Sequence, residues 1–355
     1  MKEKMTVAVL FGGQSSEHEI SCMSVVNVVS AMDKEKYNVQ IIGITEDGRW
    51  LKVEDTQSIK DGTWISSKVQ AIISPDAGDA AMLLISDAGV EKVSLDVIFP
   101  VLHGMNGEDG TVQGLFELSK IPYVGCGVLA SAVSMDKVYT KLIVDTLGIR
   151  QAKYVVITHL DMKCVDDCVA KVEEKMDYPV FVKPSKAGSS RGVSKACDRQ
   201  QLVDGLNEAI RHDIKILVEE TITGREIECA VLGGYAPEAS NVGEVLSADA
   251  ALYSFEAKYY NADSRTDLRP VFPEGKLEEV RRDAVDIFKA VDGYGLARVD
   301  FFLEKDTNDV IFNEINTLPG FTGISMYPML WEDKGVPKAE LIDRLIAQAF
   351  ERYKA

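Results

Sequence analysis

The chain has 355 residues, with 46% hydrophobic and 27% charged residues, which is typical of a globular protein with more than one domain. Its net charge of −17 argues against general binding to nucleic acids or anionic membranes, although a local group of lysines can still bind phosphate. No apolar run approaches the ~20 residues of a membrane helix, and six scattered cysteines without a CxxC motif are typical of free cytosolic thiols.

The first part of the chain, residues 1–124, alternates between predicted strands and helices. We expect strands at 6–11, 39–44 and 96–101 and a helix over 24–32. This alternation favours a parallel sheet with helices on its faces. Residues 60–92 have no clear pattern and are expected to form irregular connections.

The remainder is predicted to form two further parts, 125–219 and 220–355. Hydrophobic periodicity indicates helices at 136–147, 162–175, 199–210, 275–291 and 337–353, and strands at 180–182, 216–219 and 226–232. The chain contains no internal repeat and no low-complexity linker.

Four polar residues near the carboxyl end alternate along two apolar segments joined by a polar turn. Arg298 and Asp300 are two residues apart, and so are Glu314 and Asn316. Because side chains alternate between the faces of a strand, a hairpin would gather three oxygen ligands and one guanidinium on one surface. Such hard ligands suit Mg²⁺ beside nucleotide phosphates. Each acid taken alone is better explained as a solvated residue on an open sheet face.

Two glycine-rich segments follow predicted strands of the first part. Segment 12–17 is consistent with a ligand-binding turn at a helix N-terminus, or with a structural turn capped by serine. Segment 100–110 places His103 at the end of a buried strand, where α/β folds bind ligands. A hydrogen-bonded structural histidine explains this second segment about as well.

Lysine and glutamate residues in the middle of the chain are candidates for nucleotide binding. Lys183 ends a predicted strand and precedes a loop of small residues, an arrangement in which an ammonium and backbone N–H groups hold phosphates. Lys137 offers a second ammonium, although a single lysine is usually only solvated. Glu219 and Glu226 are consistent with nucleotide binding, and equally with exposed acids around a hairpin turn.

A tyrosine-rich polar segment, 250–269, is long for a loop within a compact domain and is expected to be a lid or binding loop. Together with the segments above, it resembles the D-alanine–D-alanine ligase family of the ATP-grasp superfamily. Matching motifs run in order along nearly the whole chain: LFGGQSSEHEIS, FPVLHGMNGEDGTVQG, MDK, FVKPSKAGSSRG, VEETITGRE, EAKYY, ARVDFF and NEINTLPGFTGISMYP. Eight matches in order make the resemblance highly specific.

The resemblance implies an α/β (α+β) protein with an ATP-grasp fold, preceded by a Rossmann-like amino-terminal domain. Its cofactors would be ATP and two Mg²⁺ ions, with Mn²⁺ as an alternative. The implied nucleotide and metal residues are Lys137 and Lys183 for phosphates, Glu219 and Glu226 for the nucleotide, and Asp300, Glu314 and Asn316 for the ions.

The resemblance also implies the residues that bind substrate. Glu17, with His103 nearby, would accept the ammonium of the first D-alanine, Arg298 and Gly320 would steady the developing oxyanion, and Ser325 and Lys258 would bind the second carboxylate. Glu17, Ser189 and Tyr259 resemble a hydrogen-bonded triad that ties the lid to the amino-terminal domain.

The implied reaction activates the carboxylate of one D-alanine as an acyl phosphate, which the amine of a second D-alanine then attacks. Met326 follows Ser325 where D-serine ligases tend to carry arginine, so the sequence favours D-alanine as second substrate. A D-alanine–D-serine ligase and a two-lobed small-molecule-binding protein are the alternatives. A cytoplasmic homodimer that binds small molecules, without nucleic acid or membrane, is expected.

Overall fold

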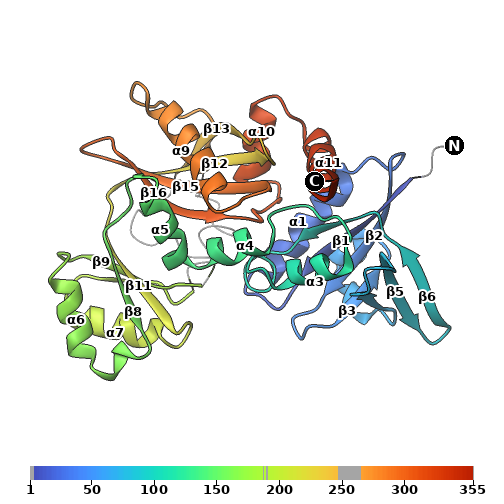
Figure 1. Cartoon of the computed structure of the whole chain (residues 1–355), viewed down its shortest axis with the longest axis horizontal. Helices are drawn as coiled ribbons and strands as arrows, with labels where there is room; N and C mark the ends of the chain where they lie inside the picture. The colour runs from blue at the N-terminus through green and yellow to red at the C-terminus, as the bar shows by residue number, and fades with distance from the viewer. Residues whose placement is uncertain (1–3, 187, 189–190, 247–264, 355) are drawn as a thin grey trace.

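The computed structural model describes residues 4–186, 188, 191–246 and 265–354, and it contains three β-sheets. The seven-stranded sheet occupies one end of the molecule, and the other two sheets occupy the other end (Figure 1). Among the described helices, none is both long and apolar enough to cross a lipid bilayer. The six cysteines are free thiols.

The first sheet has a parallel centre and an antiparallel extension, in the order β6-β5-β4-β3-β2-β1-β7. Its strands are β1 (Met5–Gly12), β2 (Tyr37–Ile44), β3 (Trp50–Val53), β4 (Gln70–Ile73), β5 (Ala81–Ser86), β6 (Gly89–Ser94) and β7 (Val97–Val101). Strand β1 pairs in parallel with β2 and β7, as predicted. All other pairs are antiparallel, so the expectation of irregular connections over 60–92 was wrong.

The edge strand of the extension, β6, escaped prediction because none of its residues is fully buried. Every residue of β6 is exposed or half-exposed, so its sequence shows no apolar alternation. The helices that accompany this sheet are α1 (His18–Ala31), α2 (Thr56–Lys60), the 3₁₀ helix η1 (Thr63–Ser66) and α3 (Thr111–Ser119). Helix α1 begins earlier than the predicted 24–32 and packs on β1.

The second sheet has four antiparallel strands in the order β10-β9-β11-β8. They are β8 (Tyr154–Thr158), β9 (Val180–Pro184), β10 (Ser194–Ala196) and β11 (Lys215–Glu220). Helices α6 (Val165–Glu173) and α7 (Arg199–Ala209) bury their apolar residues with this sheet in one core, and η2 (Asp161–Lys163) precedes α6. Helices α4 (Val128–Met135) and α5 (Lys137–Asp145) connect the first sheet to the second.

The third sheet has five antiparallel strands and two different faces. In spatial order its strands are β14 (Arg265–Asp267), β13 (Glu238–Leu246), β12 (Gly224–Gly233), β15 (Gly295–Glu304) and β16 (Val310–Asn316). Helix α9 (Lys276–Ala290) covers one face, where Ile227, Val299 and Phe312 are buried with its apolar side. The opposite face is apolar at one end, where α10 (Met326–Asp333) packs, and polar at the other.

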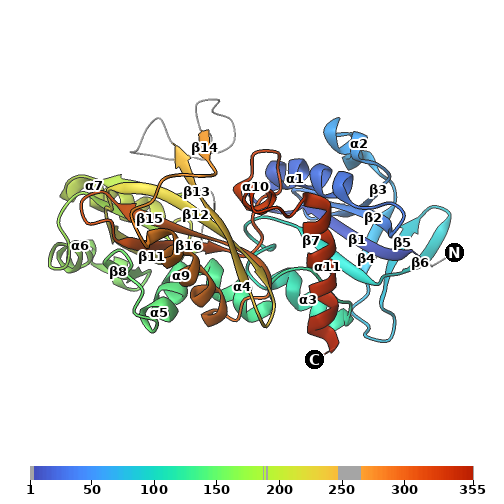
Figure 2. The same ribbon diagram turned by 90° about the horizontal axis from the view of Figure 1, so that it is seen from above.

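The carboxyl-terminal helix α11 (Lys338–Lys354) joins the two ends of the molecule. Its residues Leu341, Leu345 and Ile346 belong to the same core as Val7 of β1 and Leu296 of β15. Figure 2 shows α11 crossing beside β7 and α3. Packing of this helix therefore helps to set the position of the first sheet relative to the third.

We expect Leu345→Ala to destabilise the protein by about 2–5 kcal/mol, because it leaves a cavity in that shared core. Leu345 is fully buried. The measurement is urea unfolding followed by circular dichroism. Leu160→Ala is the matched control, since Leu160 is 59% exposed and should change stability by no more than about 0.5 kcal/mol. Equal effects of the two substitutions would contradict the role assigned to α11.

Candidate active site

Polar side chains from three neighbouring strands share one face of the third sheet. Asp300 on β15 is paired in register with Glu228 on β12 and with Glu314 on β16, and Arg298 is paired with Asn316. Side chains directly opposite one another in an antiparallel sheet lie on the same face. The predicted hairpin and its alternation are therefore confirmed, and Glu228 is an additional acid that the sequence analysis did not single out.

These side chains bond to one another. Arg298 donates from Nε and Nη2 to Asp300 at 2.8 and 2.7 Å, and its Nε lies 3.1 Å from an oxygen of Glu228. Asn316 Nδ2 donates to Asp300 at 3.0 Å. Among the described residues, no three His, Cys, Asp or Glu side chains group closely enough to hold a metal ion. The predicted metal ligands are therefore two carboxylates, Asp300 and Glu314, and the amide oxygen of Asn316. Hard oxygen ligands of this kind fit a divalent cation.

Lys137 begins α5 at the edge of this polar face. Its Nζ lies 3.5 Å from Glu314 Oε2. Its backbone N–H donates to the carbonyl of Ser185 at 3.0 Å, and the Ser185 hydroxyl donates to Asp136 at 2.6 Å. Because Asp136 also caps α5 through the N–H of Tyr139, these bonds fix the first turn of the helix to the end of β9.

Glu219 on β11 lies between two ammonium groups, that of the buried Lys141 and that of the half-buried Lys183. Lys141 Nζ lies 2.6 Å from Oε1, and Lys183 Nζ lies 2.6 Å from Oε2. Burial alone would raise the pKa of Glu219, but the two lysines outweigh burial and lower it to about 2. Burial would lower the pKa of Lys183, but the charge of Glu219 outweighs it and raises that pKa. Glu219 and Lys183 are therefore both charged at neutral pH.

The charged groups of the second and third sheets act on one another. The charges of Glu314 and Glu226 also raise the pKa of Lys183, although Lys183 belongs to the other sheet. The predicted nucleotide residues thus lie near the predicted metal residues. Lys141 was missed in the sequence, although its spacing of four residues from Lys137 places both on one side of a helix.

Glu17 lies where the first and second sheets approach each other. It forms the N-cap of α1 without a side-chain capping bond, and its N–H donates to Ser15 Oγ at 3.1 Å. A Cβ added to Gly104 would lie 2.5 Å from Glu17 Oε2, and one added to Gly188 would lie 3.1 Å away. The carboxylate therefore sits against two backbone segments that have no room for a larger side chain.

His103 is a buried, hydrogen-bonded residue that bridges the first and third sheets. Its Nδ1–H donates to the carbonyl of Leu318 at 2.8 Å, and its Nε2 accepts from the hydroxyl of Ser24 at 3.1 Å. The Ser24 hydroxyl in turn accepts from the N–H of Phe321 at 3.2 Å. Burial lowers the pKa of His103, so its imidazole is neutral at physiological pH.

The segment 317–326 carries three of the predicted substrate residues. Ser325 Oγ accepts from the N–H of Thr322 at 2.9 Å, and a Cβ added to Gly320 would lie 2.8 Å from that oxygen. Met326 is only 3% exposed and packs its sulfur against Gly243 on β13. Gly320 and Ser325 thus lie together, whereas the side chain of Met326 is part of the apolar core beneath α10.

Several predictions fall on residues outside the described part of the chain. They are Ser189, Lys258, Tyr259 and most of the predicted lid, 250–269, of which the structure describes 265–269. Within those five residues, β14 pairs with β13.

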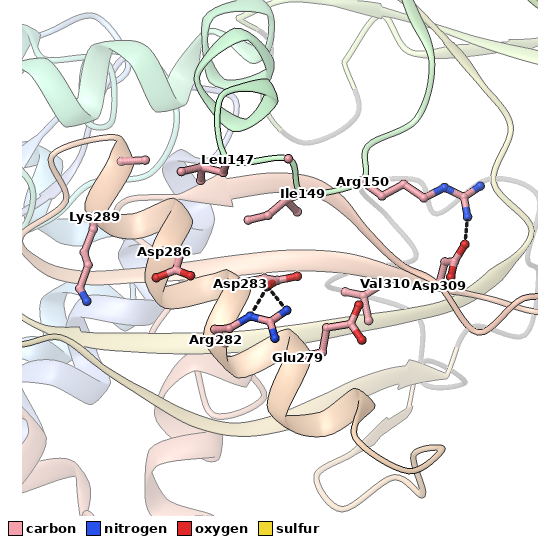
Figure 3. Close-up of a pocket in the computed structure, with 12 residues that line it drawn as sticks. Leu147, Ile149, Arg150, Glu279, Arg282, Asp283, Asp286, Lys289, Asp309 and Val310 are labelled. Atoms are coloured by element: carbon pink, nitrogen blue, oxygen red, sulfur yellow. Dashed lines mark hydrogen bonds and ion pairs between the residues drawn. The ribbon is translucent and has the colours of Figure 1, made fainter.

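A separate groove of 680 Å³ lies on the α9 side of the third sheet (Figure 3). It is lined by the loop 147–150, by α9 and by the start of β16. Two ion pairs lie within the groove, Arg282 with Asp283 and Arg150 with Asp309. None of the predicted site residues that the structure describes lines this groove, so it is not part of the candidate active site.

Family models match both halves of the chain. The model described as "D-ala D-ala ligase N-terminus" matches residues 6–126, and the model described as "D-ala D-ala ligase C-terminus" matches residues 143–347. A D-alanine–D-alanine ligase of Ruminiclostridium cellulolyticum is 50% identical, over 99% of this chain and 96% of that protein. One of Acetivibrio thermocellus is 49% identical, over 99% of this chain and 98% of that protein.

Solved structures with the same fold include ligases of two specificities. The VanG D-Ala:D-Ser ligase of Enterococcus faecalis has a TM-score of 0.88 and 34% identity, and the match covers 98% of this chain and 100% of that one. The D-alanine–D-alanine ligase of Coxiella burnetii has a TM-score of 0.85 and 36% identity, with 99% and 95% covered.

Proposed function

The chain belongs to the D-alanine–D-alanine ligase family, and we propose that the polar face of β12, β15 and β16 is its active site. The protein is an ATP-dependent ligase that joins two D-alanines through a D-alanyl phosphate and releases ADP and phosphate, for peptidoglycan synthesis. The register pairing of Asp300 with Glu314, with Lys137 3.5 Å from Glu314, is the observation that carries this assignment.

Lysines at the edge of the polar face are proposed to bind the phosphates of ATP. Lys137 and Lys183 come from different elements, so their charges can act on one triphosphate from two sides. Glu219 and Glu226 are proposed to hold the nucleoside through their carboxylate oxygens. The charge of Glu226 on Lys183 supports a common location for these groups.

The family requires a divalent metal, and we propose two Mg²⁺ ions, with Mn²⁺ as an alternative, held by Asp300, Glu314 and Asn316. Two carboxylates in register and an adjacent amide are donors of the right chemistry. When bound, such ions neutralise charge on the phosphate oxygens during transfer. Because Arg298 bonds to both oxygens of Asp300, its guanidinium must share that carboxylate with an ion.

The side chains around this face are suited to each step of the reaction. Glu17 accepts the ammonium of the first D-alanine, with His103 nearby, which leaves its carboxylate free to attack the γ-phosphorus of ATP. Arg298 and the backbone at Gly320 stabilise the oxyanion that forms when the second amine attacks the acyl carbon. Water would hydrolyse the acyl phosphate, so closure by segment 250–269, through the proposed triad Glu17, Ser189 and Tyr259, is part of the proposal.

The second substrate is proposed to be bound through its carboxylate by Ser325 and Lys258. An apolar residue, Met326, follows Ser325, and it offers no partner to the hydroxyl of D-serine. A buried hydroxyl without a partner costs about 1–3 kcal/mol, which favours the methyl group of D-alanine. Because Met326 is buried in the core beneath α10, we propose that it acts on this preference through the packing at the start of the helix and not through direct contact with the substrate.

We expect ADP release with D-alanine alone, and mass spectrometry should identify D-alanyl-D-alanine as the product. With equal D-alanine and D-serine, the D-alanyl-D-alanine product should dominate about 10-fold, as a penalty of about 1.4 kcal/mol implies. Reactions without ATP or without divalent metal are the controls. Faster incorporation of D-serine than of D-alanine would contradict the specificity, and absence of any dipeptide would contradict the function.

We also propose three domains, 1–124, 125–219 and 220–355, and a homodimer. The strands of the three sheets fall within these ranges, except that β11 ends at Glu220. Light scattering after size-exclusion chromatography should give about twice the chain mass of 39.0 kDa. A mass equal to one chain at micromolar concentration would contradict the dimer.

A further inference from the structure

Glu108, in the loop between β7 and α3, bonds to two separate segments of backbone. Its Oε1 accepts from the N–H of Gly104 at 3.0 Å, and its Oε2 accepts from the N–H of Leu318 at 3.0 Å. Gly104 belongs to the same loop as His103, whereas Leu318 follows β16 in the third sheet. One carboxyl group thus joins the two segments through both of its oxygens, and we call these two hydrogen bonds of Glu108 the clamp.

Leu318 is held from both sides by side chains of this loop. Its N–H bonds to Glu108, and its carbonyl bonds to His103 at 2.8 Å. Two residues before Leu318 lies Asn316, and two residues after it lies Gly320. A shift of the Leu318 backbone would therefore move Gly320 relative to Glu17, which sits against Gly104 on the other side of the clamp.

We propose that Glu108 is a positioning residue that holds segment 317–320 against segment 103–108 and so sets the distance between the groups that bind the two ends of the first D-alanine. This inference rests on the proposed roles of Glu17 at the ammonium and of Gly320 at the oxyanion. A misplacement of about 1 Å in such a site can cost 10²-fold in rate.

The Glu108→Gln substitution tests the clamp because it keeps the shape and removes one acceptor. A carboxylate accepts at both oxygens, whereas an amide accepts at one and donates at the other. The NH₂ group of glutamine would therefore face the N–H of either Gly104 or Leu318. At pH 9 we expect kcat/KM for D-alanine to fall by roughly 10- to 100-fold, while the KM for ATP stays within about threefold.

Asp109→Asn is a matched control in the same loop. Asp109 also accepts from two N–H groups, those of Asn106 at 2.9 Å and Thr111 at 3.0 Å, but Asn106 lies in its own loop and Thr111 begins α3. Its substitution should lower the melting temperature and leave kcat/KM for D-alanine within about threefold, because it breaks no bond between the two segments. Equal losses of kcat/KM in the two variants, or no loss in Glu108→Gln, would overturn the proposal.

Hydrogen exchange measures the clamp without relying on the reaction. Glu108→Gln should speed amide exchange in peptides that cover 317–322, whereas Asp109→Asn should speed it only within 104–111. Unchanged exchange at 317–322 in Glu108→Gln would overturn the clamp. If wild-type protein makes no dipeptide, the proposed function fails, and exchange at 317–322 still decides whether the clamp exists.

The pH dependence of kcat/KM for D-alanine is a further test, because substitution of a purely structural residue would leave this dependence unchanged. Burial, followed by the charge of Glu17, raises the pKa of Glu108 to about 8, while its two backbone N–H partners and Arg298 act in the opposite direction. His103, the other titratable group at the clamp, is neutral in this range. Because only the ionised carboxyl accepts fully at both oxygens, kcat/KM for D-alanine should rise between pH 7 and 9 in the wild type more steeply than in Glu108→Gln. Parallel profiles would count against the proposal.

Discussion

Glu314→Gln should reduce turnover by at least about 100-fold while the protein stays folded. Glu314 is paired in register with Asp300 and lies 3.5 Å from Lys137, so its carboxylate serves both the proposed metal site and the phosphate-binding lysine. The amide keeps the size of the side chain and removes its charge. ADP release at several Mg²⁺ concentrations, with circular dichroism melts of the same samples, measures both effects.

The stability of Glu314→Gln should fall by no more than about 3 kcal/mol, because the ion pair with Lys137 is largely buried, with side chains 18% and 26% exposed. Glu304→Gln is the control in the same hairpin. Glu304 ends β15, four residues beyond Asp300, and pairs with Arg150, so its substitution should leave turnover unchanged. Wild-type-like turnover in Glu314→Gln would refute the metal assignment, whereas equal losses in both variants would indicate damage to the hairpin.

The hairpin that carries this prediction could be read from the sequence because both of its segments alternate over several residues. Period-2 alternation places Arg298 and Asp300 on one face without any knowledge of the rest of the fold. The same rule failed at β6, since this edge strand has no fully buried residue and leaves no alternation to detect.

The contacts that complete the site could not be read in this way. Glu108 and Leu318 are 210 residues apart, and their bond depends on how the first sheet packs on the third. The sequence indicated Glu219 only as a candidate nucleotide ligand. Its ion pairs could not be predicted, because Lys141 comes from helix α5 and Lys183 from the neighbouring strand β9. Tertiary packing decides which charged groups are buried, and residue spacing along the chain does not predict it.

Lys141→Met should weaken ATP binding, because it changes the charge around Glu219. Lys141 and Lys183 share one carboxylate, so the group of three carries one net positive charge. Without Lys141, Glu219 would neutralise Lys183, and less positive charge would remain for the phosphates of ATP. We expect the KM for ATP to rise about 10-fold or more, which corresponds to about 1.4 kcal/mol of lost binding. Affinity for adenosine should change less, because adenosine has no phosphates, and this difference can be measured by calorimetry.

Stability should fall as well, and the loss should depend on pH. The pKa of Glu219 is lowered to about 2 from 4.5, so its ionised form contributes about 3 kcal/mol above pH 4.5, and this contribution disappears as the pH falls towards 2. Lys141→Met removes part of that stabilisation, so we expect a cost of about 1–2 kcal/mol at pH 7. The difference in unfolding free energy from wild type should therefore narrow below pH 4.5.

Lys153→Met provides the comparison for Lys141→Met, because Lys153 lies 3.9 Å from Glu220, the residue next to Glu219, and is 66% exposed. An exposed pair of this kind contributes at most about 1 kcal/mol, and no loss of ATP affinity is expected. Urea unfolding at pH 7 and pH 3.5 separates the two lysines. A pH-independent deficit in Lys141→Met would mean that the residue acts through packing of its hydrocarbon stem. Similar losses of ATP and adenosine affinity would mean that it shapes the nucleoside site and does not preserve the charge of Lys183.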